Sequence, residues 1–309
     1  MQRVFVVGCP RSGTTIVQAM LARHPRVYSL EETYFFSALL GNADMRWGDR
    51  GARKLERWYH RAGMARSSAR RRLRELEHIY EPQSRHARSL FRASTCVRHY
   101  IALLDCLAEA QCKSHWVEKT PDHLVYIEEI AREVPNARFV HVLRNGLDVI
   151  ASITDADLHH YTAGFRGGVR MWAARWNRAM TLHLAKAGDP GHHLVCLEDL
   201  VADPCAEWER LCAFLGLEAD AVLEARPSPA VVNSRVEPWK SGAAAGTVEH
   251  PRHKARSLFG PRMLSWLESH LTDYHAVRAA IECNRRIGAQ TERHGGTSGR
   301  SAVRRAAHH

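Results

Sequence analysis

The chain has 309 residues, of which 45% are hydrophobic and 25% are charged, and its formal net charge is +11. These proportions are ordinary for a globular enzyme, and no apolar run reaches the roughly 18 residues that a membrane span needs. All but six of the 44 basic residues are arginines, and no zinc-finger or RNA-module pattern accompanies them. We therefore expect no nucleic-acid partner and no membrane span.

Cysteine usage and the start of the chain bear on the compartment. The eight cysteines include no CxxC pair, so we interpret them as reduced, mostly buried thiols rather than metal ligands. The first apolar strand follows Met1 almost directly, which leaves no room for a secretory signal. We expect a cytoplasmic protein without a metal site.

The first segment, VFVVGCPRSGTTIVQAMLARHP, begins at Val4 and contains the clearest motif. It predicts a buried strand, a loop with Gly8 and Gly13, and a helix that opens at Thr14. A glycine loop before a helix presents N–H groups and a positive dipole to an anion. The spacing fits a nucleotide-phosphate loop, but Thr14 replaces the usual lysine and the cation is Arg11. We predict a loop for a less charged phosphate-like group that needs no metal.

Strand-like and helix-like segments alternate along the rest of the chain, which predicts an α/β fold. The expected architecture has three layers, with a central, mostly parallel sheet between helices, as in P-loop proteins. Strands are expected at 4–8, 27–30, 115–117, 138–143 and 193–197, and helices at 14–22, 98–111, 124–133, 167–186 and 205–215.

Three segments depart from this alternation. Residues 42–95 are arginine-rich and helical in pattern, which indicates a helical insertion or cap, and 66–74 is expected to be a solvated helix face. Proline, glycine and alanine interrupt 226–255, which predicts a long loop. We expect one domain over residues 1–288 and a tail without fixed structure over 289–309.

A second motif, RFVHVLRNGLDVIAS, runs from Arg138 to Ser152. Arg144 at the end of a strand can fork onto a phosphate, and Ser152 can donate a further hydrogen bond. Together with PRSGTT at 10–15, this motif resembles the two nucleotide-binding motifs of sulfotransferases that use 3′-phosphoadenosine 5′-phosphosulfate (PAPS). The resemblance implies that the first loop holds the 5′-phosphosulfate and that Arg144 and Ser152 hold the 3′-phosphate.

Three shorter segments extend this resemblance over roughly residues 4–245. EKTP at 118–121 is similar to an element that follows a strand in many sulfotransferases, and EDL at 198–200 with DP at 203–204 is similar to a turn that opens a helix. HP at 24–25 and LEET at 30–33 resemble protein-tyrosine sulfotransferases, including the separation of Arg11 from Glu32. Tyr34 stands where those enzymes have arginine.

The resemblance and the charges suggest roles for individual residues. Glu32 is the expected general base, with a helix N-cap carboxylate for 33–41 as its alternative role. Lys119 would stabilise charge on the bridging oxygen, or else form a surface ion pair. Arg11 would hold the phosphosulfate, or else brace the loop. His123 could be the base, although a position near a helix N-terminus is the expected role. The expected nucleotide-binding set is Arg11, Ser12, Gly13, Thr14, Thr15, Arg144, Ser152, Ser234 and Lys240.

The sequence therefore predicts a sulfotransferase that moves a sulfuryl group from PAPS to a hydroxyl or amine, without a metal. The acceptor is left open among small molecules, carbohydrates and peptides. Two other functions remain possible on the same scaffold, namely a phosphotransferase or nucleotide hydrolase, and a nucleotide-binding protein without catalysis. The missing loop lysine argues against the first of these.

Overall fold

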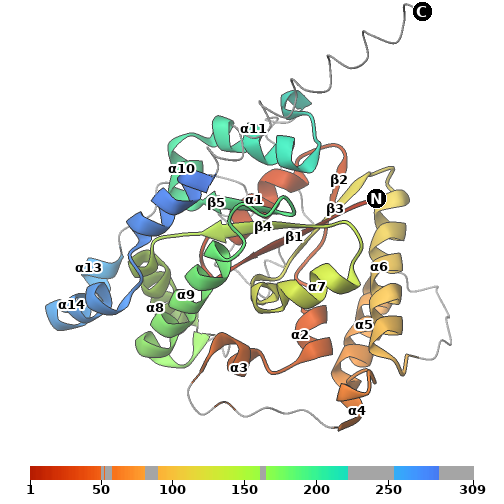
Figure 1. Ribbon diagram of the computed structural model, residues 1–309, viewed down its shortest axis with the longest axis horizontal. Helices are drawn as coiled ribbons and strands as arrows, with labels where there is room; N and C mark the ends of the chain where they lie inside the picture. The colour runs from red at the N-terminus through yellow and green to blue at the C-terminus, as the bar shows by residue number, and fades with distance from the viewer. Residues whose placement is uncertain (50–51, 53–57, 81–89, 161–164, 222–253, 285–309) are drawn as a thin grey trace, which may run out of the picture.

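A parallel sheet of five strands forms the centre of the computed structural model (Figure 1), which describes residues 1–49, 52, 58–80, 90–160, 165–221 and 254–284. The strand order is β2-β3-β1-β4-β5, and each pair of neighbours is parallel. The strands are β1 (Gln2–Gly8), β2 (Val27–Ser29), β3 (His115–Lys119), β4 (Ala137–Leu143) and β5 (His192–Cys196). Each of the five predicted strands is present, with ends shifted by at most a few residues.

Helices cover both faces of this sheet, which confirms the three-layer α/β prediction. Alternate side chains of β1 point to opposite faces, so Val4 and Val6 join one apolar cluster while Phe5 and Val7 join the other. The first cluster packs under α1 (Thr14–Ala22), α10 (Leu197–Ala202) and α11 (Pro204–Leu215). These helices lie above the sheet in Figure 1, and α2, α7 and α9 lie below it.

The second, larger cluster includes most of the other helices. These are α2 (Phe35–Leu40), α3 (Ala43–Trp47), α5 (Ser67–Tyr80), α6 (Ala93–Glu109), the 3-10 helix η1 (Pro121–Tyr126), α7 (Ile127–Glu133), α8 (Gly146–His160) and α9 (Gly168–Leu184). The short helices α4 (Trp58–Arg61), η3 (Ala219–Ala221), α13 (Ala255–Leu258) and α14 (Pro261–His270), and a helical stretch over 274–284, complete the described chain. The helices after residue 254 were not predicted from the sequence.

The predicted helical segments are present with small changes. The segment 124–133 is divided, because η1 covers 121–126 before α7 begins at Ile127. Helices α3, α4 and α5 lie within the predicted insertion 42–95, and α6 begins inside its upper limit. The predicted late loop lies outside the described residues from 226 to 253, as does the tail 289–309. In the described part of the chain, none of the helices is long and apolar enough to cross a bilayer.

The topology gathers the motifs at one edge of the sheet. The chain leaves β1 toward β2 and leaves β4 toward β5, so connections diverge between the adjacent strands β1 and β4. Open parallel sheets bind ligands at the carboxyl ends of the strands at such a divergence. The loop after β1, Arg144 after β4 and Lys119 at the end of β3 all lie at this edge.

Candidate functional site

The loop between β1 and α1 has the backbone of an anion-binding turn. Arg11 and Gly13 both adopt positive φ angles, 70° and 100°, and Ser12 N–H donates to the Cys9 carbonyl over 3.2 Å. A side chain at Gly13 would place its Cβ 2.8 Å from Leu197 Cδ1, and one at Gly8 would lie 2.5 Å from the Val142 carbonyl oxygen. Only glycine fits both positions, since added carbon atoms would clash there.

The N-terminus of α1 follows this loop without a side-chain cap, since its N-cap residue is Gly13. The first N–H groups of a helix have no acceptor inside the helix, and here Thr14 and Thr15 begin the helix in buried positions. A phosphate at this loop would therefore meet uncapped N–H groups and the positive end of the helix dipole.

The two sequence motifs, 133 residues apart at their arginines, meet at this loop. Arg144 Nη1 donates to the Arg11 carbonyl over 3.2 Å, and Arg11 Nε donates to Ser152 Oγ over 3.1 Å. Trp176 Nε1 in turn donates to the Arg144 carbonyl over 3.1 Å and fixes the end of β4. The structure thus brings Arg11, Arg144 and Ser152 together.

Two buried polar atoms at this place lack partners within the described part of the chain. They are Ser12 Oγ and Arg144 Nε. Burial lowers the pKa of Arg144, and the nearby Asp148 carboxylate opposes that change. Leaving a buried donor unsatisfied costs about 1–3 kcal/mol. Anions that accept hydrogen bonds from these side chains would remove that cost, so the residues present fit phosphate groups.

Glu32 and Lys119 form an ion pair next to this edge, between Glu32 Oε1 and Lys119 Nζ. The Lys119 side chain is 1% exposed and the Glu32 side chain 8% exposed, so this is not the surface ion pair that was the alternative role of Lys119. Helix α2 begins at Phe35 with Tyr34 as its N-cap and has no side-chain cap. Glu32 is therefore not a capping carboxylate.

A buried network holds the segment that carries Glu32, and sequence reasoning missed it. Glu118 is fully buried and accepts from Thr33 N–H over 3.1 Å and Thr33 Oγ1 over 2.9 Å. It also bonds to Thr120 Oγ1 and His123 Nδ1. The pKa of Glu118 lies below its ordinary value, because His123 and these hydrogen bonds outweigh the effect of burial. The carboxylate thus fixes residue 33 directly behind Glu32.

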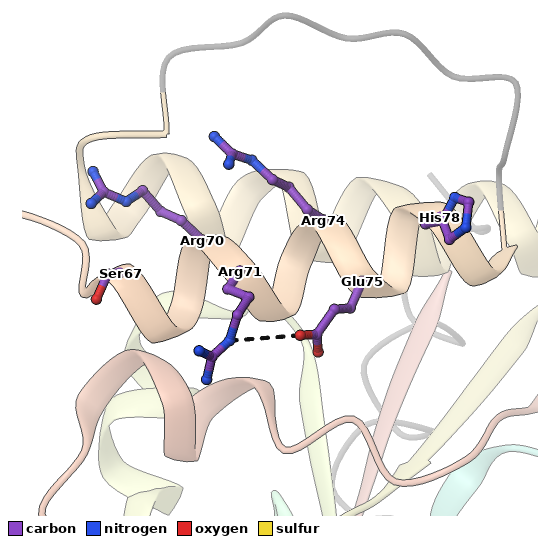
Figure 2. A pocket seen from close by; sticks show the side chains of 6 residues that line it. All are labelled: Ser67, Arg70, Arg71, Arg74, Glu75 and His78. Atoms are coloured by element: carbon purple, nitrogen blue, oxygen red, sulfur yellow. Dashed lines mark ion pairs between the residues drawn. The ribbon is translucent and has the colours of Figure 1, made fainter.

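Helix α5 supports the same segment from the other side. Arg72 donates from Nε to the Thr33 carbonyl over 2.5 Å and from Nη2 to the Glu32 carbonyl over 3.1 Å. The rest of this arginine-rich helix matches the predicted solvated face: Figure 2 shows the open hollow lined by Ser67, Arg70, Arg71, Arg74, Glu75 and His78. Glu75 ion-pairs with Arg71 over 3.6 Å and with Arg72 over 3.1 Å.

The remaining candidates have other contacts or lie outside the described residues. His123 is buried, bonds to Glu118 and packs against the rings of Phe5 and Phe36. Trp172 and Trp176 pack in the core. Ser234 and Lys240 lie outside the described residues. Asp203 caps α11 by accepting from Ala206 N–H over 3.0 Å, and Pro204 follows it, as expected for a helix-opening turn.

The described site thus combines an anion cradle with a neighbouring acid–base pair. The cradle offers two arginines, two hydroxyl groups and the end of a helix, and the pair offers a carboxylate beside an ammonium group. Such groups can hold a phosphate, stabilise charge that develops on a leaving oxygen, and accept a proton.

Comparisons with known proteins bear on the family of this chain. The model of the sulfotransferase family matches residues 3–221. Protein-tyrosine sulfotransferase 1 of Danio rerio is 28% identical over 232 residues, which cover 72% of this chain and 56% of the relative. Protein-tyrosine sulfotransferase A of Caenorhabditis elegans is 26% identical over 227 residues, covering 70% and 50%. The chain spans about half the length of these curated relatives.

Solved structures were compared as well. The sulfotransferase domain from the Synechococcus PCC 7002 olefin synthase aligns with a TM-score of 0.49 at 17% identity and covers 94% of each chain. The match of the family model over residues 3–221, which is most of the chain, is the finding that assigns the protein: it belongs to the sulfotransferase family.

Proposed function

We propose that this protein transfers a sulfuryl group from PAPS to an acceptor hydroxyl or amine and releases adenosine 3′,5′-bisphosphate (PAP). The observation that carries the proposal is the meeting of Arg11, Arg144 and Ser152 at the carboxyl edge of the sheet. These groups offer one anion site at the α1 N-terminus and a second cationic group at Arg144. PAPS carries a 3′-phosphate and a 5′-phosphosulfate on its ribose, so its binding requires two such anion sites.

In the proposed reaction, the acceptor oxygen attacks sulfur in line with the bond to the 5′-phosphate. Glu32 takes the acceptor proton, and Lys119 stabilises the charge on the phosphate oxygen that leaves. Arg11 and the N–H groups of residues 12–15 hold the phosphosulfate, and Arg144 with Ser152 binds the 3′-phosphate. Ser234 and Lys240 remain proposed nucleotide contacts.

The Glu32–Lys119 contact supports this division of roles. The buried carboxylate and ammonium group neutralise each other in the absence of substrates. During the reaction, the carboxylate can bind the acceptor proton while the ammonium group binds the negatively charged leaving oxygen. Removal of one partner leaves the other charge buried and uncompensated. Glu32 and Lys119 can therefore separate only when the bound donor and acceptor replace their ion pair with new interactions.

The experiment that tests the proposal incubates the protein with labelled PAPS, with and without EDTA, and with a panel of phenols, tyrosine peptides, amines and sugars. We expect PAP formation that an acceptor accelerates and that EDTA leaves unchanged. Hydrolysis of ATP with Mg²⁺, and no turnover of PAPS, would instead support a nucleotide hydrolase. Binding of PAP without any turnover would support a nucleotide-binding protein.

The acceptor and the compartment belong to the same proposal. Small molecules, carbohydrates and peptides remain the acceptor classes that the panel distinguishes. None of the eight cysteines, which all lie among the described residues, forms a disulfide there. A reducing, cytoplasmic compartment stays part of the proposal.

A further inference from the structure

The carboxylate of Glu32 is occupied on both oxygens. Oε1 accepts from Lys119 Nζ, and Oε2 accepts from the hydroxyl of Tyr34. With a side-chain exposure of 8%, Glu32 has little surface left for another donor. While Lys119 stays on Oε1, an acceptor hydroxyl that gives its proton to Glu32 therefore takes the place of the Tyr34 hydroxyl on Oε2.

Tyr34 is held at its backbone and open at its ring. Its φ and ψ angles, 50° and 18°, are left-handed, a conformation that is uncommon for residues other than glycine. Its N–H donates to Thr120 Oγ1 over 3.2 Å, and Thr33 before it is bound to Glu118. The residue is nevertheless 43% exposed. The fold thus presents a solvent-accessible phenol with its hydroxyl directed at the proposed base.

This geometry is what a general base requires of its substrate. The base must lie within hydrogen-bond reach of the proton that it removes, and a reacting group held in place by the same chain has a high effective concentration. Resting on the proposed function, we propose that Tyr34 is itself a sulfation site, modified once per chain from PAPS when no other acceptor is bound.

The chemistry balances with the groups named. The Tyr34 oxygen forms a bond to sulfur while the bond between sulfur and the 5′-phosphate oxygen breaks. The electron pair of that bond leaves with the phosphate of PAP, beside Lys119. The phenol proton passes to Glu32. The products are an O-sulfated Tyr34 and PAP.

Three buried tyrosines of the described chain lack this combination of features. Tyr274 also donates to a carboxylate, Glu198 Oε2, over 2.6 Å, but it is 5% exposed. Tyr100 is fully buried and bonds to Thr33 Oγ1, and Tyr126 donates to the Gly41 carbonyl. Tyr34 therefore combines exposure with a hydrogen bond to the proposed base.

Intact-protein mass spectrometry tests the proposal. The full chain is incubated with PAPS alone, and the adduct is mapped by peptide fragmentation. We expect the mass of one sulfuryl group on Tyr34, none in Tyr34→Phe or Glu32→Gln, and an unchanged gain in Tyr28→Phe, which alters the tyrosine on β2. Calorimetric titration with PAP runs in parallel on each variant.

The parallel titration separates the possible failures. If the wild-type protein binds PAP but gains no mass, sulfation of Tyr34 is overturned and the proposed donor is retained. Hydrolysis of PAPS to PAP without a protein adduct has the same meaning. A mass gain that persists in Tyr34→Phe also overturns it. Absence of both PAP binding and mass gain overturns the proposed function together with this inference.

Discussion

Glu32 and Lys119 are buried against each other, so a change in either residue alters both the chemistry and the local charge balance. The variant Glu32→Gln keeps the shape but cannot accept a proton. Because proton transfer to a positioned side chain is typically worth about 10²–10⁴ in rate, we expect PAP release from PAPS to slow by that order. Donor affinity should change little, because the carboxylate does not belong to the nucleotide cradle.

Two further variants distinguish the roles at this pair. Lys119→Ala should also slow the reaction. The loss of rate should be smaller with a donor whose leaving group is more acidic, because that group needs less charge stabilisation. His123→Ala should have a mild effect on the rate, since His123 faces Glu118. Near-normal turnover in Glu32→Gln with collapse in His123→Ala would assign the base to the histidine. Thermal unfolding of each variant checks that an uncompensated buried charge has not unfolded the protein.

Glu118 is predicted to act as a positioning residue. Glu118→Gln weakens the hydrogen bonds to Thr33 and Thr120 and removes the charge beside His123. We expect turnover to fall about tenfold or more, a shifted pH–rate profile and nearly unchanged PAP affinity. The matched control is Glu207→Gln, another buried glutamate bound to a histidine, His193, over 3.2 Å. Equal loss of turnover in both variants would show that Glu118 stabilises the fold and does not specifically position Glu32.

At the scale of elements, the first strand, loop and helix could be predicted closely because their signals are local. Apolar residues, two glycines and the threonines of α1 lie within one short stretch. Glu118 and Arg72 could not be predicted as the partners of Thr33 and Glu32, since 85 and 40 residues separate the bonded groups and only the folded chain joins them. The end of η1 and the start of α7 likewise depend on tertiary packing.

Three histidines connect the elements β4, α9 and β5. His141 Nδ1 lies 2.9 Å from His183 Nδ1, and His141 Nε2 lies 2.8 Å from His192 Nδ1. Burial lowers the pKa of His183 to about 3 and that of His192 to about 4, and it lowers the pKa of His141 as well. These rings are therefore neutral in the folded protein, and His183 Nε2 has no partner among the described residues.

The sign of the pH dependence follows from these lowered pKa values. Below the ordinary value of 6.5 the unfolded chain binds protons that the folded chain does not, so stability falls as the pH decreases from about 6.5 toward 4. Each such histidine contributes about 1.4 kcal/mol per pH unit in that window. Urea unfolding at pH 7 and pH 5 measures the loss.

The variant His183→Leu removes one of these groups, so it should lose less stability than the wild type between the two pH values. His78→Leu, an exposed change on α5, should behave like the wild type. An equal loss in all three proteins would show that the histidine cluster does not set the acid sensitivity.

At the scale of the whole molecule, thiol chemistry tests the expected compartment. Four cysteines are buried, at positions 9, 96, 196 and 212, and four are exposed, at 106, 112, 205 and 283. Burial raises the pKa of Cys212 to about 11. We expect four thiols to react readily in the native, unreduced protein and all eight to react after denaturation. Few reactive thiols after denaturation would indicate disulfides and an oxidising compartment.

The connections of the parallel sheet diverge between β1 and β4. Our central claim is that a nucleotide binds at the carboxyl edge of the sheet at this point. Calorimetric titration with PAP and with adenosine 5′-phosphate tests it most directly. We predict that PAP binds equally well with EDTA or Mg²⁺. Arg144→Ala should weaken PAP roughly tenfold to a hundredfold, as expected for loss of about 1.5–3 kcal/mol, and barely affect adenosine 5′-phosphate. Arg138→Ala, at the other end of β4, is the matched control and should change neither affinity. Equal weakening of both nucleotides by Arg144→Ala, or PAP binding that requires Mg²⁺, would contradict the account.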